Sequence, residues 1–482
     1  MFIYCKGERL KSLRSAHTEY LPLPFFDFLP DFLPDSFHPA FHLFFSHAVF
    51  RAFFQSVFQS VFLQCYGQSP MTTVALKQYP SQYSATVSSA DSLLETATRI
   101  ANQAALRAAS LDCAGAFPAE EFTQLAAAGL LAAPIHPAYG GIGLGFQSDQ
   151  TGLLLQILKQ IGRGNLSLGR VFEGHINGLQ LVQTFGRPEQ VKALAQDALA
   201  AKVFGVWNAE AADGVKIVPI GGDRYRLVGS KTFCSGCGYV ERPFVNGALP
   251  DGRWQMCIVP MEKVNVEVDA SWWQPPGMRA SASYKVDFTG VEVTNAALIG
   301  QPGDYFRQPW LTSGVVRFAA VQLGGAEALF DATRTYLQGL GRTDHPHQQA
   351  RLGQMAIALE QGNLWLQGGA NKIEQYAPVF GDMPSANLED TEDIEDMEEK
   401  ADRMQLVQYC NMVRTAIEQI CMDMIQLSER CIGTNGLLPP HPMERIIRDL
   451  TLYLRQPAFD ASLTGIGEYV LTTKAPARDL WI

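Results

Sequence analysis

The stretch YRLVGSKTFCSGC, Tyr225 to Cys237, lies near the middle of the 482-residue chain and has the pattern of short β-strands. Its β-branched and aromatic residues alternate in part, and Gly229 interrupts them. Segments of the same kind, separated by glycine, proline and aspartate, extend from about Lys202 to Leu298. This region therefore predicts an antiparallel β domain.

Helical patterns lie on both sides of this β region. From about Ser88 to Ala200, apolar residues recur at spacings of three and four, as in SADSLLETATRIANQAALRAASLD, residues 89–112. From about Phe306 onward the same periodicity returns in longer segments, which predict a bundle. We therefore expect the α+β fold class, with an N-terminal helical domain (71–200), a middle antiparallel β domain (201–300) and a C-terminal four-helix bundle (301–482).

The first 70 residues differ in composition from the rest of the chain. They hold 14 of the 28 phenylalanines and only five acidic residues. The polar spacing from Phe41 to Gln64 would suit an amphipathic helix on a membrane surface. The other interpretation is that residues 1–70 are an N-terminal extension, disordered or ahead of a natural start at Met71.

Charge and cysteine content exclude several classes of function. The net charge of −10 and the pI of about 5.5 argue against general nucleic-acid binding, which requires a basic face. Nine scattered cysteines indicate a reducing compartment, and we expect a cytoplasmic protein. The CxxC pair Cys234 and Cys237 lacks the further ligands of a zinc site, so packing is the expected role. The acidic run 389–400 predicts a solvated segment, and we expect no metal site.

Four stretches carry a family resemblance in their order along the chain. They are FPAEEFTQLAAAGLLAAPIHPAYGGIGLG (117–145), YRLVGSKTFCSGC (225–237), GMRASASYKVDFTGVEV (277–293) and GTNGLLPPHPMERIIRDLTLY (433–453). With the order of domains, they make residues 88–460 resemble the acyl-CoA dehydrogenase superfamily of flavoproteins. The resemblance implies FAD, with FMN as the alternative, held between the β domain and the bundle. It also implies a homodimer or homotetramer in which a neighbouring subunit completes the cofactor site.

Carried onto this sequence, the resemblance implies two groups of cofactor-binding residues. In the β domain, Val206, Trp207 and Asn208 would lie near the flavin pyrimidine, although Trp207 suits a core position equally well. Phe233 would pack on the flavin ring and Ser235 would hydrogen bond to it. In the bundle, the residues implied at the diphosphate and adenine are Arg342, Gln354, Arg430, Gly433 and Gly436.

The catalytic carboxylate of the family has no counterpart at its usual position. In the stretch RDLTLYLRQPAFD (448–460), that position falls at Pro457, which has no proton-accepting side chain. Some relatives carry the carboxylate on an earlier helix, but that position is Gly314 here. The family's CoA-contacting arginine falls at Val315, with Arg317 two residues away. Asp460 is the remaining candidate for a relocated base.

Three functions remain open at this point. The first expectation is an FAD-dependent oxidoreductase that dehydrogenates an acyl thioester at its α,β bond and passes a hydride to the flavin, with an unidentified electron acceptor. The alternative is a flavin-dependent monooxygenase of the same fold, which needs no carboxylate at position 457. In that alternative, LGRVFEGHINGL (168–179) would place His175 near the substrate. The third possibility is a binding or assembly protein without turnover.

Overall fold

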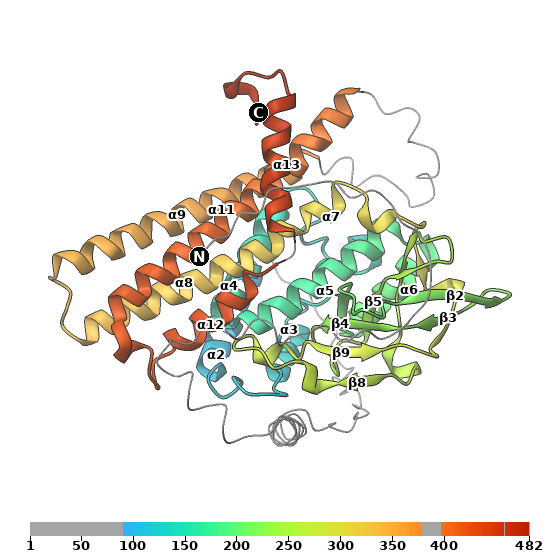
Figure 1. Cartoon of the computed structure of the whole chain (residues 1–482), viewed down its shortest axis with the longest axis horizontal. Helices are drawn as coiled ribbons and strands as arrows, with labels where there is room; N and C mark the ends of the chain where they lie inside the picture. Colours follow the sequence, from blue (N-terminus) through green and yellow to red (C-terminus); the bar gives the residue numbers. More distant parts are fainter. Residues whose placement is uncertain (1–89, 377–396, 457, 482) are drawn as a thin grey trace, which may run out of the picture. The chain divides into compact units, whose positions relative to one another are not determined.

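A computed structural model describes residues 90–376, 397–456 and 458–481 (Figure 1). The predicted extension 1–70, Pro457 and the first part of the acidic run, 389–396, lie outside the described residues. No helix within the described ranges is long and apolar enough to cross a membrane.

The first region is helical, as the sequence predicts. Its amphipathic helices bury one face each; in α4, for example, Leu154, Leu158 and Ile161 are buried at helical spacing. The elements are α2 (Ala90–Arg107), α3 (Ala119–Ala127), η3 (Pro137–Tyr139), α4 (Thr151–Gly164), α5 (Leu166–Phe185) and α6 (Pro188–Leu199).

The middle region consists of short strands in three sheets. The strands are β1 (Phe204–Trp207), β2 (Lys216–Gly221), β3 (Arg224–Val228), β4 (Ser230–Cys234), β5 (Arg242–Val245), β6 (Gly247–Ala248), β7 (Trp254–Cys257), β8 (Glu267–Asp269), β9 (Tyr284–Asp287), β10 (Glu292–Thr294) and β11 (Leu298–Ile299). Their order is β1-β5 in one sheet, β10-β3-β2-β6-β7-β11 in the second and β4-β9-β8 in the third. Most pairs are antiparallel, but β1 pairs with β5 and β2 with β6 in parallel, which the sequence did not predict. Short 3-10 turns η4 (Met261–Lys263), η5 (Ala270–Trp272), η6 (Arg279–Ser281), η7 (Asn295–Ala297) and η8 (Asp304–Phe306) lie between or after the strands.

The last region returns to helices. Its elements are α7 (Trp310–Ser313), α8 (Val315–Gly339), α9 (Pro346–Gln375), α11 (Met397–Gly436), α12 (Met443–Tyr453), α13 (Phe459–Thr472) and η10 (Ala477–Asp479). Near its end, α11 is broken at Gly433, whose φ of 57° and ψ of −168° are not helical. The predicted order of helices, β domain and helical bundle is therefore confirmed.

The N-terminal helix α4 packs against α8 and α9 and so joins the bundle (Figure 1). Glycines allow this close approach: a Cβ atom added at Gly162 would lie 2.3 Å from the carbonyl oxygen of Val321, and one at Gly324 would lie 2.0 Å from that of Lys159. The main hydrophobic core runs through this contact, from α4 across the β domain to α8 and α11. The helical and β regions therefore fold around shared packing.

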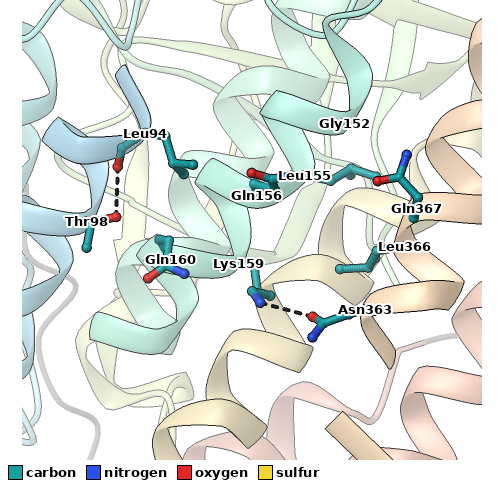
Figure 2. Close-up of a pocket in the computed structure, with 10 residues that line it drawn as sticks. All are labelled: Leu94, Thr98, Gly152, Leu155, Gln156, Lys159, Gln160, Asn363, Leu366 and Gln367. Atoms are coloured by element: carbon teal, nitrogen blue, oxygen red, sulfur yellow. Dashed lines mark hydrogen bonds between the residues drawn. The ribbon is translucent and has the colours of Figure 1, made fainter. Parts of the chain in front are cut away.

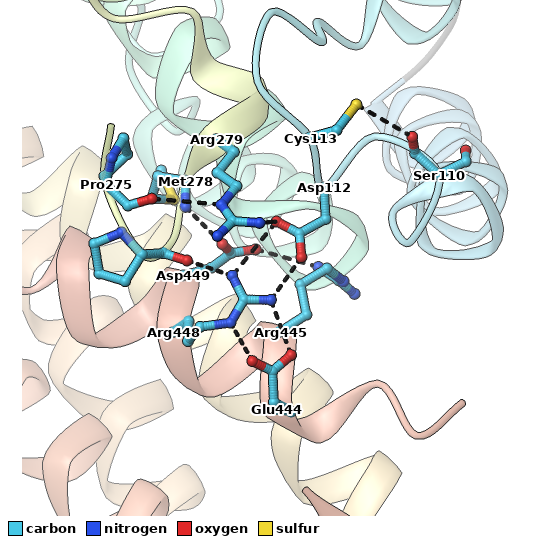
Figure 3. A network of polar contacts seen from close by, with 11 residues as sticks. Ser110, Asp112, Cys113, Pro275, Met278, Arg279, Glu444, Arg445, Arg448 and Asp449 are labelled. Atoms are coloured by element: carbon cyan, nitrogen blue, oxygen red, sulfur yellow. Dashed lines mark hydrogen bonds and ion pairs between the residues drawn. The ribbon is translucent and has the colours of Figure 1, made fainter. Parts of the chain in front are cut away.

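A network of charges holds α12 against the other two regions (Figure 3). The Arg448 guanidinium contacts Asp112, in the turn after α2, with 2.5 Å between Nη2 and Oδ2, and it also donates to the Pro276 carbonyl. The neighbouring Asp449 accepts a hydrogen bond of 2.6 Å from the backbone N–H of Met278. Because these partners come from both of the other regions, the network holds α12 in place against them.

Candidate functional site

The cofactor residues predicted in the β domain lie together at the ends of β1 and β4. Trp207 is fully buried, and its Nε1–H donates to the Ser235 carbonyl oxygen at 2.9 Å. Its side chain is therefore a core aromatic that ties the two strands together. Asn208 and Val206 remain half-buried, and the carboxamide oxygen of Asn208 accepts from Asn246 at 3.0 Å.

The aromatic ring of Phe233 is exposed to solvent beside these predicted cofactor residues. Its side chain is 51% exposed, although its neighbours in β4 are buried, and its φ of 52° is unusual for a bulky residue. Trp272 and Trp273 stand edge-on to it, with ring centroids 4.8 and 5.9 Å away. The indole N–H of Trp273 is buried and has no hydrogen-bond partner among the described residues. An accessible ring beside an unsatisfied donor fits a flat aromatic ligand with polar edges.

Three hydroxyl groups run inward from Ser235. Its Oγ lies 2.8 Å from Ser283 Oγ, which lies 2.7 Å from Ser281 Oγ. Ser235 is half-buried, whereas Ser281 and Ser283 are buried. The chain of hydroxyls can therefore reorient its protons so that Ser235 either donates to a ligand or accepts from one.

The second predicted cofactor group lies at one end of the bundle. Arg342, Gln354 and Arg430 are exposed there. The end of α11 is held to the start of α9, because Arg351 and Gln348 donate to the carbonyl oxygens of Arg430 and Cys431 at 3.4 and 3.3 Å. The break at Gly433 leaves its backbone open, since a Cβ atom added there would meet nothing within 4 Å.

The two predicted groups do not meet within the chain. Figure 1 shows the connection between α8 and α9 on the opposite side of the described part from β4. Gly433 and Gly436, at the end of α11, lie with the bundle group; Gly436 is buried against Ile432.

Asp460, the predicted relocated base, is exposed on the first turn of α13. Its carboxylate lies near Glu418. The pKa of Glu418 is raised by burial and, to a lesser degree, by the charge of Asp460. A general base gains from a site that excludes water, so this position gives the proposed role no support.

His175 does not have the role suggested for it at the substrate. It is fully buried, its Nε2 lies 2.7 Å from the Leu131 carbonyl oxygen, and its Nδ1 accepts from the Phe204 N–H at 3.0 Å. Burial lowers the pKa of the imidazole to about 4. Both ring nitrogens are occupied, so His175 joins α5 to β1 as a neutral structural residue.

Cys234 and Cys237 are free and buried, as expected for packing residues. Burial raises the pKa of the Cys237 thiol to about 12 and that of Cys234 as well, so neither sulfur is a reactive thiolate at neutral pH. Within the described ranges, no group of three or more His, Cys, Asp or Glu side chains could hold a metal ion.

A buried polar cluster lies between α5 and the first turn of α8. Glu173 accepts from Arg170 at 2.8 Å and from the Asn177 amide. The guanidinium of Arg317 donates to Asn177 Oδ1 at 2.5 Å and to the Gln180 amide oxygen. This cluster was not predicted from the sequence, although its signal was present: the four α5 residues fall at spacings of three, four and three on a helix whose other residues are mostly apolar.

Tyr453, the last residue of α12, borders this cluster. Its side chain is buried, and its hydroxyl has no hydrogen-bond partner among the described residues. Burial raises the pKa of this hydroxyl; the Glu173 carboxylate raises it further, and the Arg170 charge opposes the rise. The backbone oxygen of Tyr453 accepts from Gln322 of α8 at 3.0 Å, which holds the end of α12 against the bundle.

A separate pocket of about 290 Å³ opens between α2, α4 and α9 (Figure 2). Its walls combine leucine side chains with amides. The titratable residue in its wall is Lys159, which donates to Asn363 at 3.0 Å and pairs with Glu327 at 2.8 Å. With no carboxylate, histidine or cysteine in its lining, the pocket has no groups for acid–base or nucleophilic chemistry.

Two family models match the chain and together cover more than half of it. The one described as acyl-CoA dehydrogenase, N-terminal domain, matches residues 89–201, and the one described as acyl-CoA dehydrogenase, C-terminal domain, matches residues 316–455.

Several individual proteins, monooxygenases among them, are similar to most of the chain. The dibenzothiophene monooxygenase of Mycolicibacterium goodii is 23% identical over 396 residues, 76% of this chain and 90% of that protein. A probable acyl-CoA dehydrogenase, YngJ of Bacillus subtilis, is 26% identical over 271 residues, 52% of this chain and 70% of that protein. The crystal structure of FMN-bound TdsC from Paenibacillus sp. A11-2 superimposes with a TM-score of 0.69 at 21% identity, covering 81% of this chain and all of TdsC.

Proposed function

The chain belongs to the acyl-CoA dehydrogenase superfamily, and from that premise we propose that it is a flavin-dependent monooxygenase that takes up reduced FMN. The observation that carries the proposal is the lack of a carboxylate at both positions where dehydrogenases of this fold place their base. These positions are Pro457 and Gly314 in this chain. Dehydrogenation beside a thioester carbonyl requires such a base, whereas oxygen transfer from a flavin does not.

The comparisons support the same choice. The match to the monooxygenase spans 90% of that protein, whereas the match to the probable dehydrogenase spans 70%. Dehydrogenation of an acyl thioester, our first expectation from the sequence, is therefore less well supported than its alternative. A binding protein without turnover has no observation in its favour.

When bound and reduced, the flavin supplies two electrons to O2, so that one oxygen atom enters the substrate and the other leaves as water. In this proposal the Phe233 ring packs against the flavin, and Ser235 hydrogen bonds to it through a hydroxyl that Ser283 orients. Backbone N–H groups around Val206 and Asn208 bind its pyrimidine edge. Trp272 and Trp273, which stand edge-on to Phe233, shield the edge of the flavin ring from water.

We further propose that a second copy of the chain completes the cofactor site. The connection between α8 and α9 lies across the described part from β4 (Figure 1), so in this proposal a cofactor that touches both groups lies between two copies. The exposed guanidinium groups of Arg342 and Arg430 are suited to a phosphate. FMN is the form we favour, because the similar structure of TdsC contains it; with FAD, Gln354 would lie at the adenine.

Isotope incorporation tests the proposed reaction. The full-length chain is supplied with FMN, NADH and a separate flavin reductase under 18O2, with a panel of organosulfur and amine compounds that includes dibenzothiophene. We expect one 18O atom in a product, measured by mass spectrometry, and none when the reductase is omitted. Conversion of an acyl thioester to its enoyl product without the reductase would contradict the proposal.

A further inference from the structure

Three serine hydroxyls form a chain that begins at the proposed flavin site and ends inside the β domain. Ser235 Oγ lies 2.8 Å from Ser283 Oγ, and Ser283 Oγ lies 2.7 Å from Ser281 Oγ. Ser235 is half-buried, whereas Ser283 and Ser281 are only 3% and 1% exposed. Within the described part of the chain, Ser281 Oγ has no hydrogen-bond partner other than Ser283, so the chain of hydroxyls ends there.

The number of protons decides in which direction these hydroxyls donate. Each hydroxyl donates one hydrogen bond, and the chain has three contacts to fill: Ser281 with Ser283, Ser283 with Ser235, and Ser235 with a ligand. When every hydroxyl donates outward, all three protons are used. When every hydroxyl donates inward, the proton of Ser281 is left without an acceptor in a buried place, which is unfavourable. Outward donation is therefore the preferred arrangement.

A ligand that donated to Ser235 would have to reverse this arrangement or use a weaker acceptor for the Ser235 proton. That other acceptor is the Phe233 carbonyl oxygen, which lies 3.4 Å from Ser235 Oγ. The distance is long for an O–H···O hydrogen bond, which usually measures about 2.5–3.0 Å. Both proton orientations are geometrically possible, but a ligand that accepts from Ser235 is favoured over one that donates to it.

The backbone around these hydroxyls is held in an unusual conformation. Ala282, between the two buried serines, has a φ of 44°, and Phe233, two residues before Ser235, has a φ of 52°. Alanine and phenylalanine rarely adopt positive φ angles. The two segments are tied together, because the Gly236 N–H donates to the Ser281 carbonyl oxygen at 2.8 Å. Strained backbone persists where the surrounding structure holds it, often at ligand sites, and here it fixes the inner hydroxyls relative to the outer one.

We propose that Ser281 and Ser283 are positioning residues, which direct the Ser235 proton outward so that Ser235 donates a hydrogen bond to an acceptor atom of the flavin. Neither buried serine touches the cofactor in this arrangement, since each acts through the next hydroxyl of the chain. The inference rests on the flavin site of the proposed function. It does not rest on the reaction, because oxidised FMN can be bound without reductant or O2.

Titration of oxidised FMN into the full-length chain, without reductant, tests the proposal. Ser235→Ala should weaken FMN binding about 2–10-fold, as expected for the loss of one neutral hydrogen bond. Ser283→Ala should weaken it about 2–5-fold, because the Ser235 proton loses its orientation, and Ser281→Ala should weaken it less. The decisive result is the combination: Ser283→Ala should have no further effect in protein that already carries Ser235→Ala.

Infrared difference spectra of the bound FMN supply a readout that a purely structural role would not change. A donated hydrogen bond lowers the stretching frequency of the group that accepts it, so the same flavin band should move to higher frequency in Ser235→Ala and in Ser283→Ala. Thr333→Val is the matched control, because it removes another buried hydroxyl that lies 2.7 Å from a serine hydroxyl, that of Ser428, between α8 and α11. It should leave FMN affinity and the flavin spectrum unchanged.

An effect of Ser283→Ala that is the same with and without Ser235→Ala would overturn the proposal. A flavin band that does not move in Ser235→Ala, or wild-type protein that binds no FMN, would also overturn it. If Ser283→Ala does not fold, Ser281→Ala takes its place in the same comparison. Independent effects of the two serines together with 18O incorporation would reject the positioning role and leave the oxygenase. Coupled effects without 18O incorporation would keep the positioning role and reject the oxygenase.

Discussion

The imidazole of His175 is held neutral by its two partners, and this makes stability depend on pH. A second proton would be placed on Nδ1, which already accepts from the Phe204 N–H. The folded-state pKa of about 4 lies below the ordinary value of 6.5, so the unfolded chain binds the proton first as pH falls. We expect the free energy of unfolding to be fully retained above pH 6.5 and to decrease towards pH 4, by about 3 kcal/mol from this residue.

Urea denaturation between pH 7 and pH 4.5 measures this dependence. His175→Gln is the matched variant, because its amide can donate to Leu131 and accept from Phe204 but does not titrate in this range. The variant should show a shallower loss of stability between pH 6.5 and pH 4.5. Parallel curves for the two proteins would contradict the structural role assigned to His175.

Substitution of Phe233 should weaken flavin binding without destabilising the fold. Its ring is half exposed, so Phe233→Ala should change stability little. We expect FMN affinity to fall by about 3–10-fold, because a stacked aromatic pair contributes about 0.5–1.5 kcal/mol beyond area burial. Quenching of FMN fluorescence measures the affinity, and Leu106→Ala, an exposed apolar residue of α2, serves as the control. Equal affinity in the Phe233 variant would remove this ring from the flavin site.

Not every residue could be assigned from the sequence. A burial pattern alone cannot tell whether Trp207 faces a cofactor or a core, since both environments favour a large aromatic. The structure decides this through the hydrogen bond to Ser235. His175 was misread for a related reason: its partners, Leu131 and Phe204, are backbone groups 44 and 29 residues away, which no local motif reveals.

At the scale of elements, the attachment of α12 depends on one guanidinium. Arg448 joins Asp112, Glu444 and the Pro276 carbonyl, and its side chain is 22% exposed. We expect Arg448→Met to destabilise the protein by about 2–3 kcal/mol, below the 3–5 kcal/mol typical of a fully buried pair because water reaches this one. Arg334→Met breaks an exposed ion pair and should cost less than about 1 kcal/mol. Thermal denaturation compares the two, and equal melting temperatures would refute the role of Arg448.

Helices were predicted correctly where apolar residues recur with a strong helical period. The segments predicted as long helices after residue 306 became α8, α9 and α11. Strands β5, β6 and β11 were not predicted individually, since each is only two to four residues long, and β5 and β11 pair with strands that are distant in the sequence. The packing of α4 onto α8 also escaped prediction, because it depends on glycine contacts between distant helices.

At the scale of the whole molecule, the proposed cofactor site requires two copies. One variant, Phe233→Glu, removes the β-domain group; a second, Arg342→Glu with Arg430→Glu, removes the bundle group. We expect each alone to lose FMN binding. After co-expression, about a quarter of the sites should bind FMN, because random pairing makes half the dimers mixed and each mixed dimer has one intact site. Absence of any recovery would place the whole site within a single subunit.

The central claim, oxygenation in place of dehydrogenation, is tested most directly by an anaerobic spectrum. The full-length chain is loaded with oxidised flavin, and a panel of acyl-CoA thioesters is added while the visible absorbance is recorded. With Pro457 and Gly314 at the two base positions, we predict that the oxidised spectrum persists with every thioester. Bleaching of the bound flavin by any of them would show hydride transfer from an acyl chain and would contradict the account.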